Sequence, residues 1–255
     1  MDHKRQSYKE RNYHKMKERE YSKSYLKEKE QREYTPNTYP FARMVMLKDV
    51  LSSWDLYKAI IYFLATQVVL IIIAAANFNP EIAGALNLLA IVIGLVLVFT
   101  AIRSLRYKQA LDASRRKVKL STIIMTLVGM YIAMIFINWG LAEIGIETQA
   151  QPNQSSLEEL SSLFPIAMIF TIIIVSPVVE EYVFRELLPY SIGPSYISFF
   201  ISSFIFVALH APFGIIGWTS YLVLAGGFLF ARLKDNNIFT AIIVHIIWNA
   251  VSVLL

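Results

Sequence analysis

The sequence has 255 residues, of which 56% are hydrophobic and 17% are charged, and its formal net charge is +5. It contains no cysteine, which excludes disulfide bonds, thiolate metal ligands and a cysteine nucleophile. A mean hydropathy of +0.48, with apolar runs too long for a soluble core, indicates a polytopic membrane protein.

Residues 1–48 are hydrophilic and mix both charge signs, as in KMKEREYSKSYLKEKEQREY. We expect a flexible or loosely helical cytoplasmic extension, whose basic residues draw it to the anionic headgroups of the lipid bilayer. A docking arm for a protein partner is the alternative. Nucleic-acid binding is not expected, because acidic residues interleave with the basic ones and no base-reading motif is present.

Beyond this tail, runs of about 20 apolar residues predict an all-α transmembrane bundle of about seven spans. The predicted spans are Ala59–Ala76, Ile82–Ile102, Leu120–Leu141, Leu163–Val179, Ile192–Leu209, Ile215–Ala231 and Ile238–Leu255. We divide this part of the chain into N-terminal transmembrane helices at 49–160 and a functional core at 161–255.

The loops between the spans differ in charge. RSLRYKQALDASRRKVK, after the second span, is strongly basic, whereas EIGIETQAQPNQSSLEEL, after the third, carries only acidic charges. By the positive-inside rule the first loop is cytoplasmic and the second external. The same rule places the N-terminus, RELLPY and RLKDNN inside and the C-terminus near the outer face of the cell membrane.

The fourth span ends in SPVVEEYVFRELLPY. A charge at the centre of a bilayer costs about 2.5–3.5 kcal/mol, so charged residues there suggest function. On a continuing helix, Glu181 and Arg185 are an i,i+4 pair that can neutralise itself; alone it would be an ordinary salt bridge at a membrane face. Glu180 points about 100° away and needs a partner on another helix, or a proton.

Two histidines lie at or within predicted spans, His210 in FVALH and His245 in HIIWN. His245, Asn249 and Ser252 share one face of the last helix, and we expect this polar stripe to face protein or water rather than lipid. His210 likewise shares a face with Phe206. Taken singly, each histidine would be an interhelical hydrogen-bonding group. Together, three spans carry polar groups able to converge on one cavity.

A carboxylate, two imidazoles and a carboxamide form a hydrolytic set. Glu180 can take a proton from water and later give it to a leaving amine, while a histidine and Asn249 can stabilise the oxyanion. Alternatively, Glu180, His210 and His245 with a water would suit the open coordination of catalytic Zn²⁺. The residues alone leave both mechanisms open. A zincin is excluded, because HExxH is absent, and no aspartate lies in a predicted span to form an aspartyl dyad.

The segments EEYVFR, FVALH and HIIWN resemble the motifs EExxxR, FxxxH and HxxxN of the CPBP family. This family, also called Abi, comprises CAAX proteases and bacteriocin-processing enzymes. Every motif position matches, in the family's order, and the resemblance covers 161–255. Each motif is weak by itself, but the ordered set on membrane helices is specific.

The resemblance implies an intramembrane endopeptidase that cleaves a peptide or membrane-protein substrate near the cytoplasmic side. It assigns Glu180 as the water-activating base with His210, and His245 with Asn249 as the oxyanion site. The residues implied to support them are Glu181 and Arg185. The family was named as metalloproteases, but its CAAX endopeptidases are generally read as glutamate-dependent, and the resemblance therefore favours a metal-free mechanism.

Two other classes of function compete with this one. A non-catalytic protein of the same fold would bind a membrane partner such as a sensor kinase, or confer bacteriocin immunity, but the intact motif set argues against it. A transporter would be expected to show repeat symmetry and broken helices in both halves, which the sequence does not show.

The predicted spans contain one geometric difficulty. If the fifth span begins at the cytoplasmic face, the helical rise puts His210 about 25 Å across the membrane, far from Glu180 at the end of the fourth. The two residues meet only if the fourth helix continues through EYVFREL, or if the segment 189–194 is interfacial and shifts the fifth helix.

Overall fold

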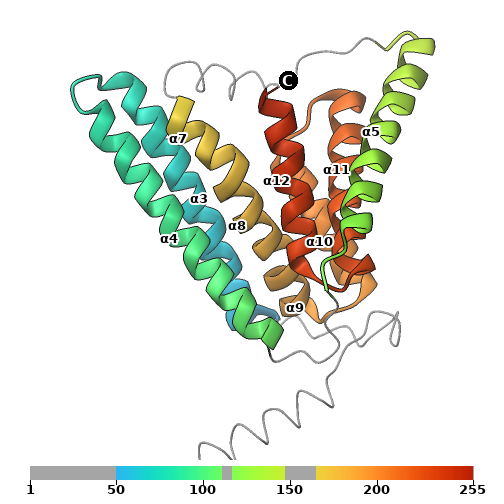
Figure 1. Ribbon diagram of the computed structural model, residues 1–255, viewed down its shortest axis with the longest axis horizontal. Helices are drawn as coiled ribbons and strands as arrows, with labels where there is room; N and C mark the ends of the chain where they lie inside the picture. The colour runs from blue at the N-terminus through green and yellow to red at the C-terminus, as the bar shows by residue number, and fades with distance from the viewer. Residues whose placement is uncertain (1–49, 111–116, 147–164, 255) are drawn as a thin grey trace, which may run out of the picture. The chain divides into compact units, whose positions relative to one another are not determined.

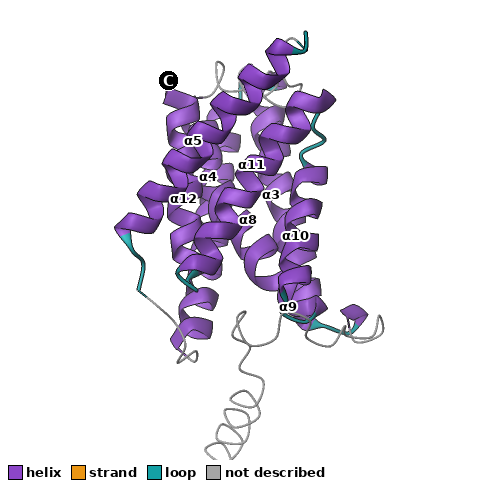
Figure 2. Ribbon diagram, turned by 90° about the vertical axis from the view of Figure 1, so that its right-hand side faces the viewer, coloured by secondary structure: helices purple, strands orange, loops and turns teal. Residues whose placement is uncertain are grey.

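The computed structural model describes residues 50–110, 117–146 and 165–254, all within one compact unit, Tyr39–Leu255. The predictions made for the tail at 1–48 concern residues outside these ranges. Within them, every regular element is a helix (Figure 2), which confirms the predicted all-α fold.

The described helices follow the predicted order (Figure 1). The first three are α3 (Trp54–Phe78), α4 (Ala83–Ala110) and α5 (Leu120–Glu143). The fourth is a continuous series of α7 (Pro165–Phe170), η1 (Thr171–Val175), α8 (Ser176–Tyr182), η2 (Val183–Leu187) and α9 (Leu188–Ile192). The last three are α10 (Tyr196–Leu209), α11 (Gly214–Lys234) and α12 (Ile238–Leu254).

Five of these helices are long and apolar enough to cross a membrane, and the chain is a multi-pass membrane protein. The exceptions are α10, with 14 residues, and α12, with 17. At 1.5 Å per residue these helices are about 21 and 25 Å long, less than the roughly 30 Å hydrocarbon core. The seven predicted spans are thus seven helices, of which two are short.

The fourth helix corrects the predicted boundaries. Its apolar run ends at Val179, but the helix continues to Ile192 and includes two π-helical turns, η1 and η2. The helix tolerates the charges because neighbouring helices bury this stretch, and Arg185 has no exposed surface. The next helix begins at Tyr196, after Gly193 with φ +101°.

These shifts remove the geometric difficulty in the predicted spans. Glu180 lies about 18 Å before the end of its helix at Ile192, and His210 lies about 21 Å beyond the start of α10 at Tyr196, by the helical rise. The two residues therefore lie at similar distances from this end of the bundle, as the first of the two expected solutions requires, and His210 stands directly after the last residue of α10.

The fourth helix stands between two groups of helices (Figure 1). α3 and α4 pack together and contact α8, η1 and η2, whereas α12 contacts α8 and η1 and α10 contacts η2. Tyr182 joins the fourth helix to the first group, because its hydroxyl hydrogen-bonds to Ser104 Oγ on α4 at 2.7 Å and its ring meets Tyr62 edge-on. The main hydrophobic core surrounds α8 and η2.

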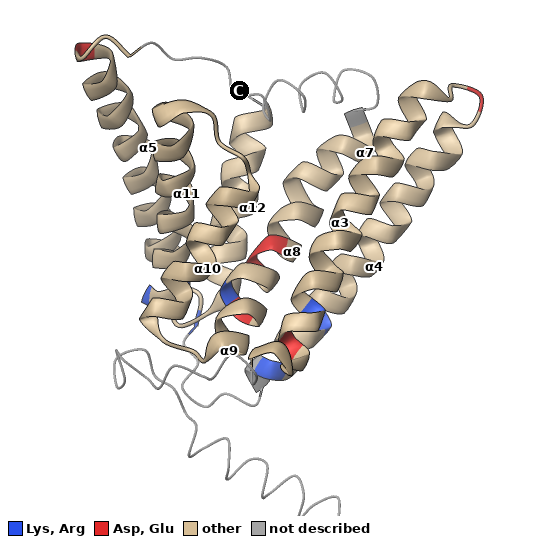
Figure 3. Ribbon diagram, turned by 180° about the vertical axis from the view of Figure 1, so that it is seen from behind, with Lys and Arg blue, Asp and Glu red and all other residues tan. Residues whose placement is uncertain are grey.

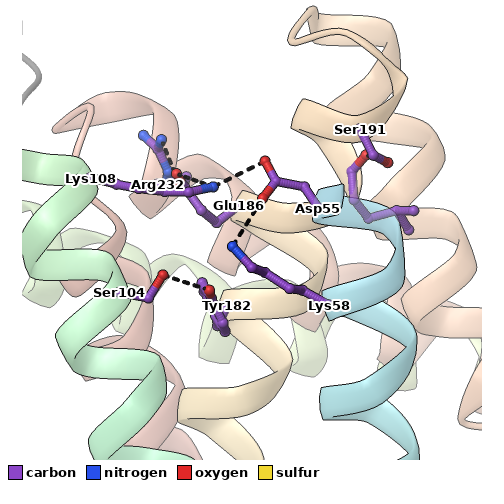
Figure 4. Close-up of polar contacts among 9 residues, drawn as sticks. Asp55, Lys58, Ser104, Lys108, Tyr182, Glu186, Ser191 and Arg232 are labelled. Carbon is purple, nitrogen blue, oxygen red and sulfur yellow. Dashed lines mark hydrogen bonds and ion pairs between the residues drawn. The ribbon is translucent and has the colours of Figure 1, made fainter. Parts of the chain in front are cut away.

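Ion pairs connect four helices at one end of the bundle (Figure 4). Lys108 on α4 lies 3.2 Å from Asp55 on α3 and 3.8 Å from Glu186 on η2. The other oxygen of Glu186 lies 3.6 Å from Arg232 on α11. We call this end of the bundle the charged end, and Figure 3 shows most Lys, Arg, Asp and Glu of the described ranges gathered toward it.

Asp235, directly after α11, anchors two further helices at the charged end. Its buried carboxylate accepts hydrogen bonds from the Lys119 amide at 3.0 Å, the Thr122 hydroxyl at 2.8 Å and the Thr240 hydroxyl at 3.0 Å. The carboxylate therefore caps the start of α5 and holds the start of α12 beside it. The starts of α3, α5 and α12 and the ends of α4 and α11 thus share one end, as the predicted alternation of loops requires.

Candidate active site

Glu180 and Glu181 hold the same histidine between them. His245 Nε2 lies 3.7 Å from Glu180 Oε2, and His245 Nδ1 lies 3.0 Å from Glu181 Oε1. A carboxylate only accepts hydrogen bonds, so His245 donates its Nδ1–H to Glu181. This bond fixes the ring orientation and turns Nε2 toward Glu180. The partner on another helix that Glu180 was predicted to need is therefore His245 on α12.

Arg185 neutralises Glu181 inside the bundle, which confirms the predicted i,i+4 pair. Its Nε lies 3.4 Å from Glu181 Oε2, and neither side chain is exposed. The guanidinium also donates to the Ala225 carbonyl on α11 at 3.3 Å and lies over the rings of Phe206, at 4.5 Å, and Phe228, at 5.8 Å. Glu181 is therefore anchored on one side while its other oxygen holds His245.

Phe206, from the second motif, lies close to residues of all three motifs. Its buried ring lies 4.4 Å from the ring of His210, 6.2 Å from that of His245 and 4.5 Å from the guanidinium of Arg185. His210 donates its Nδ1–H to the Phe206 carbonyl at 2.8 Å. In a neutral ring this leaves His210 Nε2 as an acceptor. His210 therefore lies beside Phe206, whose ring is also close to the ring of His245 and the guanidinium of Arg185, and its described contacts do not include Glu180.

Asn249 lies one turn beyond His245 on α12, and its carboxamide donates to the Ile172 carbonyl in η1 at 2.9 Å. An amide group has two N–H donors, so this bond occupies one and sets the direction of the other. Ser252, predicted to extend the same polar stripe, does not belong to the site. It is exposed, and its hydroxyl donates to the Trp248 carbonyl of its own helix at 3.0 Å, a local bond common for serine in helices.

Helix α11 contributes two aromatic residues that sequence reasoning missed. Phe228 stacks on His245 with ring centroids 4.0 Å apart and an interplanar angle of 18°. Tyr221 lies 4.8 Å from the ring of His210. Their spacing of seven residues, with Ala225 between them, puts all three on one helix face. That spacing was the signal in the sequence that could have identified these residues, but an aromatic face is common in an apolar span.

The side chains do not form a metal-binding group of the expected kind. Across the described residues, no three His, Cys, Asp or Glu side chains are arranged to hold one ion. Glu180, His210 and His245 are therefore not arranged as the three ligands of the Zn²⁺ site considered from the sequence.

The site lies inside the bundle but nearer to the charged end. Glu180 precedes Glu186 of the ion-pair network by six residues, which is about 9 Å of helix. His245 lies about 10 Å beyond the start of α12 at Ile238 by the same rise. Acid, imidazole and amide groups thus gather within a multi-pass helical bundle, an arrangement that fits intramembrane hydrolysis.

Comparisons with known proteins agree with this class. Residues 162–251 match the family model described as Type II CAAX prenyl endopeptidase Rce1-like. The match agrees with the family resemblance inferred from the three motifs, and residues 162–251 are thus similar to endopeptidases of CAAX type. It contains each of the motifs and all four helices that supply the site.

One curated relative is UPF0177 protein YvdC of Lactococcus lactis subsp. lactis (strain IL1403). It is 27% identical over 110 residues, and the match covers 42% of this chain and 42% of that protein. No solved structure matches the chain significantly.

Proposed function

We propose that this protein is an intramembrane endopeptidase that hydrolyses a peptide bond with a water activated by Glu180. The observation that carries the proposal is the arrangement of His245, with Nδ1 bonded to buried Glu181 and Nε2 3.7 Å from Glu180. A carboxylate beside an oriented imidazole is suited to move a proton during hydrolysis. The similarity of residues 162–251 to the Type II CAAX prenyl endopeptidase family model supports the same reaction class.

In this mechanism Glu180 takes a proton from water while the water oxygen attacks the carbonyl carbon of the substrate. His210, with Nε2 as an acceptor, helps to orient that water. Glu180 passes this proton to His245 Nε2, 3.7 Å away, and the imidazolium and the second amide N–H of Asn249 then stabilise the negative charge on the carbonyl oxygen. His245 gives the proton back to Glu180 as that charge collapses. Glu180 then returns its proton to the amine as the carbon–nitrogen bond breaks, which restores the starting state.

Glu181 and Arg185 support His245 and do not themselves react with the substrate. Protonation of His245 creates a positive charge in an apolar interior, which is costly without a nearby anion. The Glu181 carboxylate lies 3.0 Å from the Nδ1 atom of that ring and supplies the anion. Arg185 holds the Glu181 carboxylate in place between reactions, because its Nε lies 3.4 Å from Glu181 Oε2.

We further propose that the charged end faces the cytoplasm, with the N-terminus on the same side. The basic residues of α4 and α11 lie there, together with Lys117 and Lys119 before α5, and the turn between α3 and α4 carries only Glu81. This distribution follows the positive-inside rule. The site then opens nearer the cytoplasmic leaflet, and the substrate is a peptide or membrane-tethered protein that reaches it from this side.

The test is proteolysis by the purified, detergent-solubilised protein against a library of membrane peptides. Glu180→Gln should abolish cleavage, whereas Glu186→Gln, a matched loss of one carboxylate on the same helix, should retain it. A strong chelator should leave wild-type cleavage intact. Loss of activity with chelator would instead require a bound metal, and retention of activity by Glu180→Gln would refute the assigned base. Without cleavage by any variant, a partner-binding membrane protein is the better reading.

A further inference from the structure

Two prolines interrupt the helix that carries the glutamates. Pro177 and Pro189 are both buried and lie within the continuous helical segment. Proline has no backbone N–H, and inside a helix its ring also clashes with the preceding turn. Each proline is the second residue after a π-helical turn, and such a turn adds one residue and widens the local geometry.

In both π-turns the next backbone donor of the i→i−5 pattern would be a proline, which has no N–H. In η1 the Ser176 amide bonds to the Thr171 carbonyl, five residues earlier. The next donor in this pattern would be residue 177, directed at the Ile172 carbonyl, but residue 177 is proline. In η2 the Leu188 amide bonds to the Val183 carbonyl. The next acceptor is the Phe184 carbonyl.

The missing donor for the Phe184 carbonyl is the amide of residue 189, which is also proline. Side chains from the two neighbouring motif helices bond to both carbonyls instead. Asn249 on α12 donates to the Ile172 carbonyl at 2.9 Å. Ser202 on α10 donates to the Phe184 carbonyl at 2.6 Å, and its side chain has no exposed surface. Each proline is thus matched by one polar side chain on the helix that carries a motif histidine.

We propose that Ser202 is a positioning residue, which replaces the missing amide of Pro189 and holds α10 in register against the glutamate helix. Asn249 does the same for Pro177 on α12, in addition to its role at the oxyanion. Ser202 lies eight residues before His210 on one continuous helix. Fixing it to the η2 backbone therefore fixes the depth and rotation of His210 relative to Glu180. The part of this inference that concerns His210 rests on the proposed function.

A double-mutant cycle tests directly whether the Ser202 hydroxyl replaces the missing amide of Pro189. Pro189→Ala restores an amide that can bond to the Phe184 carbonyl, so the serine hydroxyl becomes dispensable. Ser202→Ala should lower the equilibrium constant for folding about three- to twentyfold in the wild-type background, which corresponds to membrane hydrogen bonds of about 0.6–1.7 kcal/mol. The same substitution should change it less than twofold when residue 189 is alanine. Additivity of the two substitutions would overturn the proposal.

Ser203→Ala is the matched control. This neighbouring serine is also buried, but within the described part of the chain its hydroxyl has no hydrogen-bond partner. Its removal should leave both the folding equilibrium and cleavage unchanged. A loss equal to that of Ser202→Ala would show that any hydroxyl on this helix has the same effect, and would refute the specific bond.

Measurements of cleavage show whether Ser202 also positions His210 or only stabilises the fold. Ser202→Ala should lower kcat about tenfold with KM within twofold, because misplacement of a catalytic group acts on the chemical step, and Pro189→Ala should restore it. If the two substitutions are coupled in stability but Ser202→Ala leaves kcat unchanged, the positioning role is overturned. The hydrogen bond from Ser202 to the Phe184 carbonyl would then only stabilise the fold. If the wild type cleaves nothing, the proposed function fails. The folding cycle, and a parallel cycle of Asn249→Ala with Pro177→Ala, then still test whether these side chains replace the missing amides of the prolines.

Discussion

Removal of the Glu181 charge should destabilise the protein more than removal of the whole ion pair. Glu181 and Arg185 lie 3.4 Å apart with no exposed surface. Glu181→Gln leaves a buried guanidinium whose remaining described support is the Ala225 carbonyl and two aromatic faces. Breaking a buried pair on one side costs about 3–5 kcal/mol, whereas replacing both partners with uncharged side chains of similar size is often neutral.

The assay is thermal unfolding in detergent, followed by the fluorescence of the four tryptophans. At about 2–4 °C per kcal/mol for a chain of this size, Glu181→Gln should lower Tm by roughly 6–20 °C. The double variant Glu181→Gln with Arg185→Met should recover most of that loss. Glu81→Gln, at an exposed carboxylate between α3 and α4, is the control and should leave Tm unchanged.

The comparison between the single and double variants shows whether an uncompensated charge on Arg185 causes the loss of stability. If both unfold at the same lowered temperature, the loss comes from packing around Glu181 rather than from an uncompensated charge. If the single variant unfolds at the wild-type temperature, the buried guanidinium is supported without the carboxylate. Either result would refute the view that Arg185 and Glu181 stabilise each other.

Two further predictions use the packing and composition of the chain. Gly227→Ala should destabilise the protein by about 1–3 kcal/mol, because a Cβ there overlaps the Met130 side chain on α5, whereas Gly226→Ala, with no atom within 4 Å of the added Cβ, should not. Unfolding in detergent measures both, and equal Tm values would contradict the close approach. Since the chain has no cysteine, single cysteines at Lys234 and Glu143 report orientation: an impermeant maleimide applied to intact cells should label only the second, and the reverse would invert the proposed topology.

The sequence predicted the helical order and the motif pairs because these depend on local rules. Apolar runs locate helices in a membrane whatever their neighbours are, and i,i+4 spacing places Glu181 beside Arg185 without any knowledge of the bundle. The end of the fourth helix could not be predicted in this way. Its apolar run stops at Glu180, and the helix continues only because the charges that follow find partners on other helices.

The remaining features depend on contacts between helices. The ring of Phe228 stacks on His245 from α11, and hydropathy alone gives an aromatic residue in an apolar span no special status. Ser202 and Asn249 gain their roles from prolines on a different helix. The prolines at 177 and 189 were visible as helix-interrupting residues, but which side chains would bond to the freed carbonyls follows only from the packed structure.

The depth of Glu180 limits which bond of a substrate can reach it. From the level of Glu186 to Glu180 is about 9 Å of helix, and an extended chain covers about 3.3 Å per residue. A peptide that enters from the charged end in extended form would therefore place its third residue or so at the site. If the protein has the proposed function, the fold would then select a cleavage position by its distance from the ion pairs at Glu186 rather than by the identity of the side chains alone.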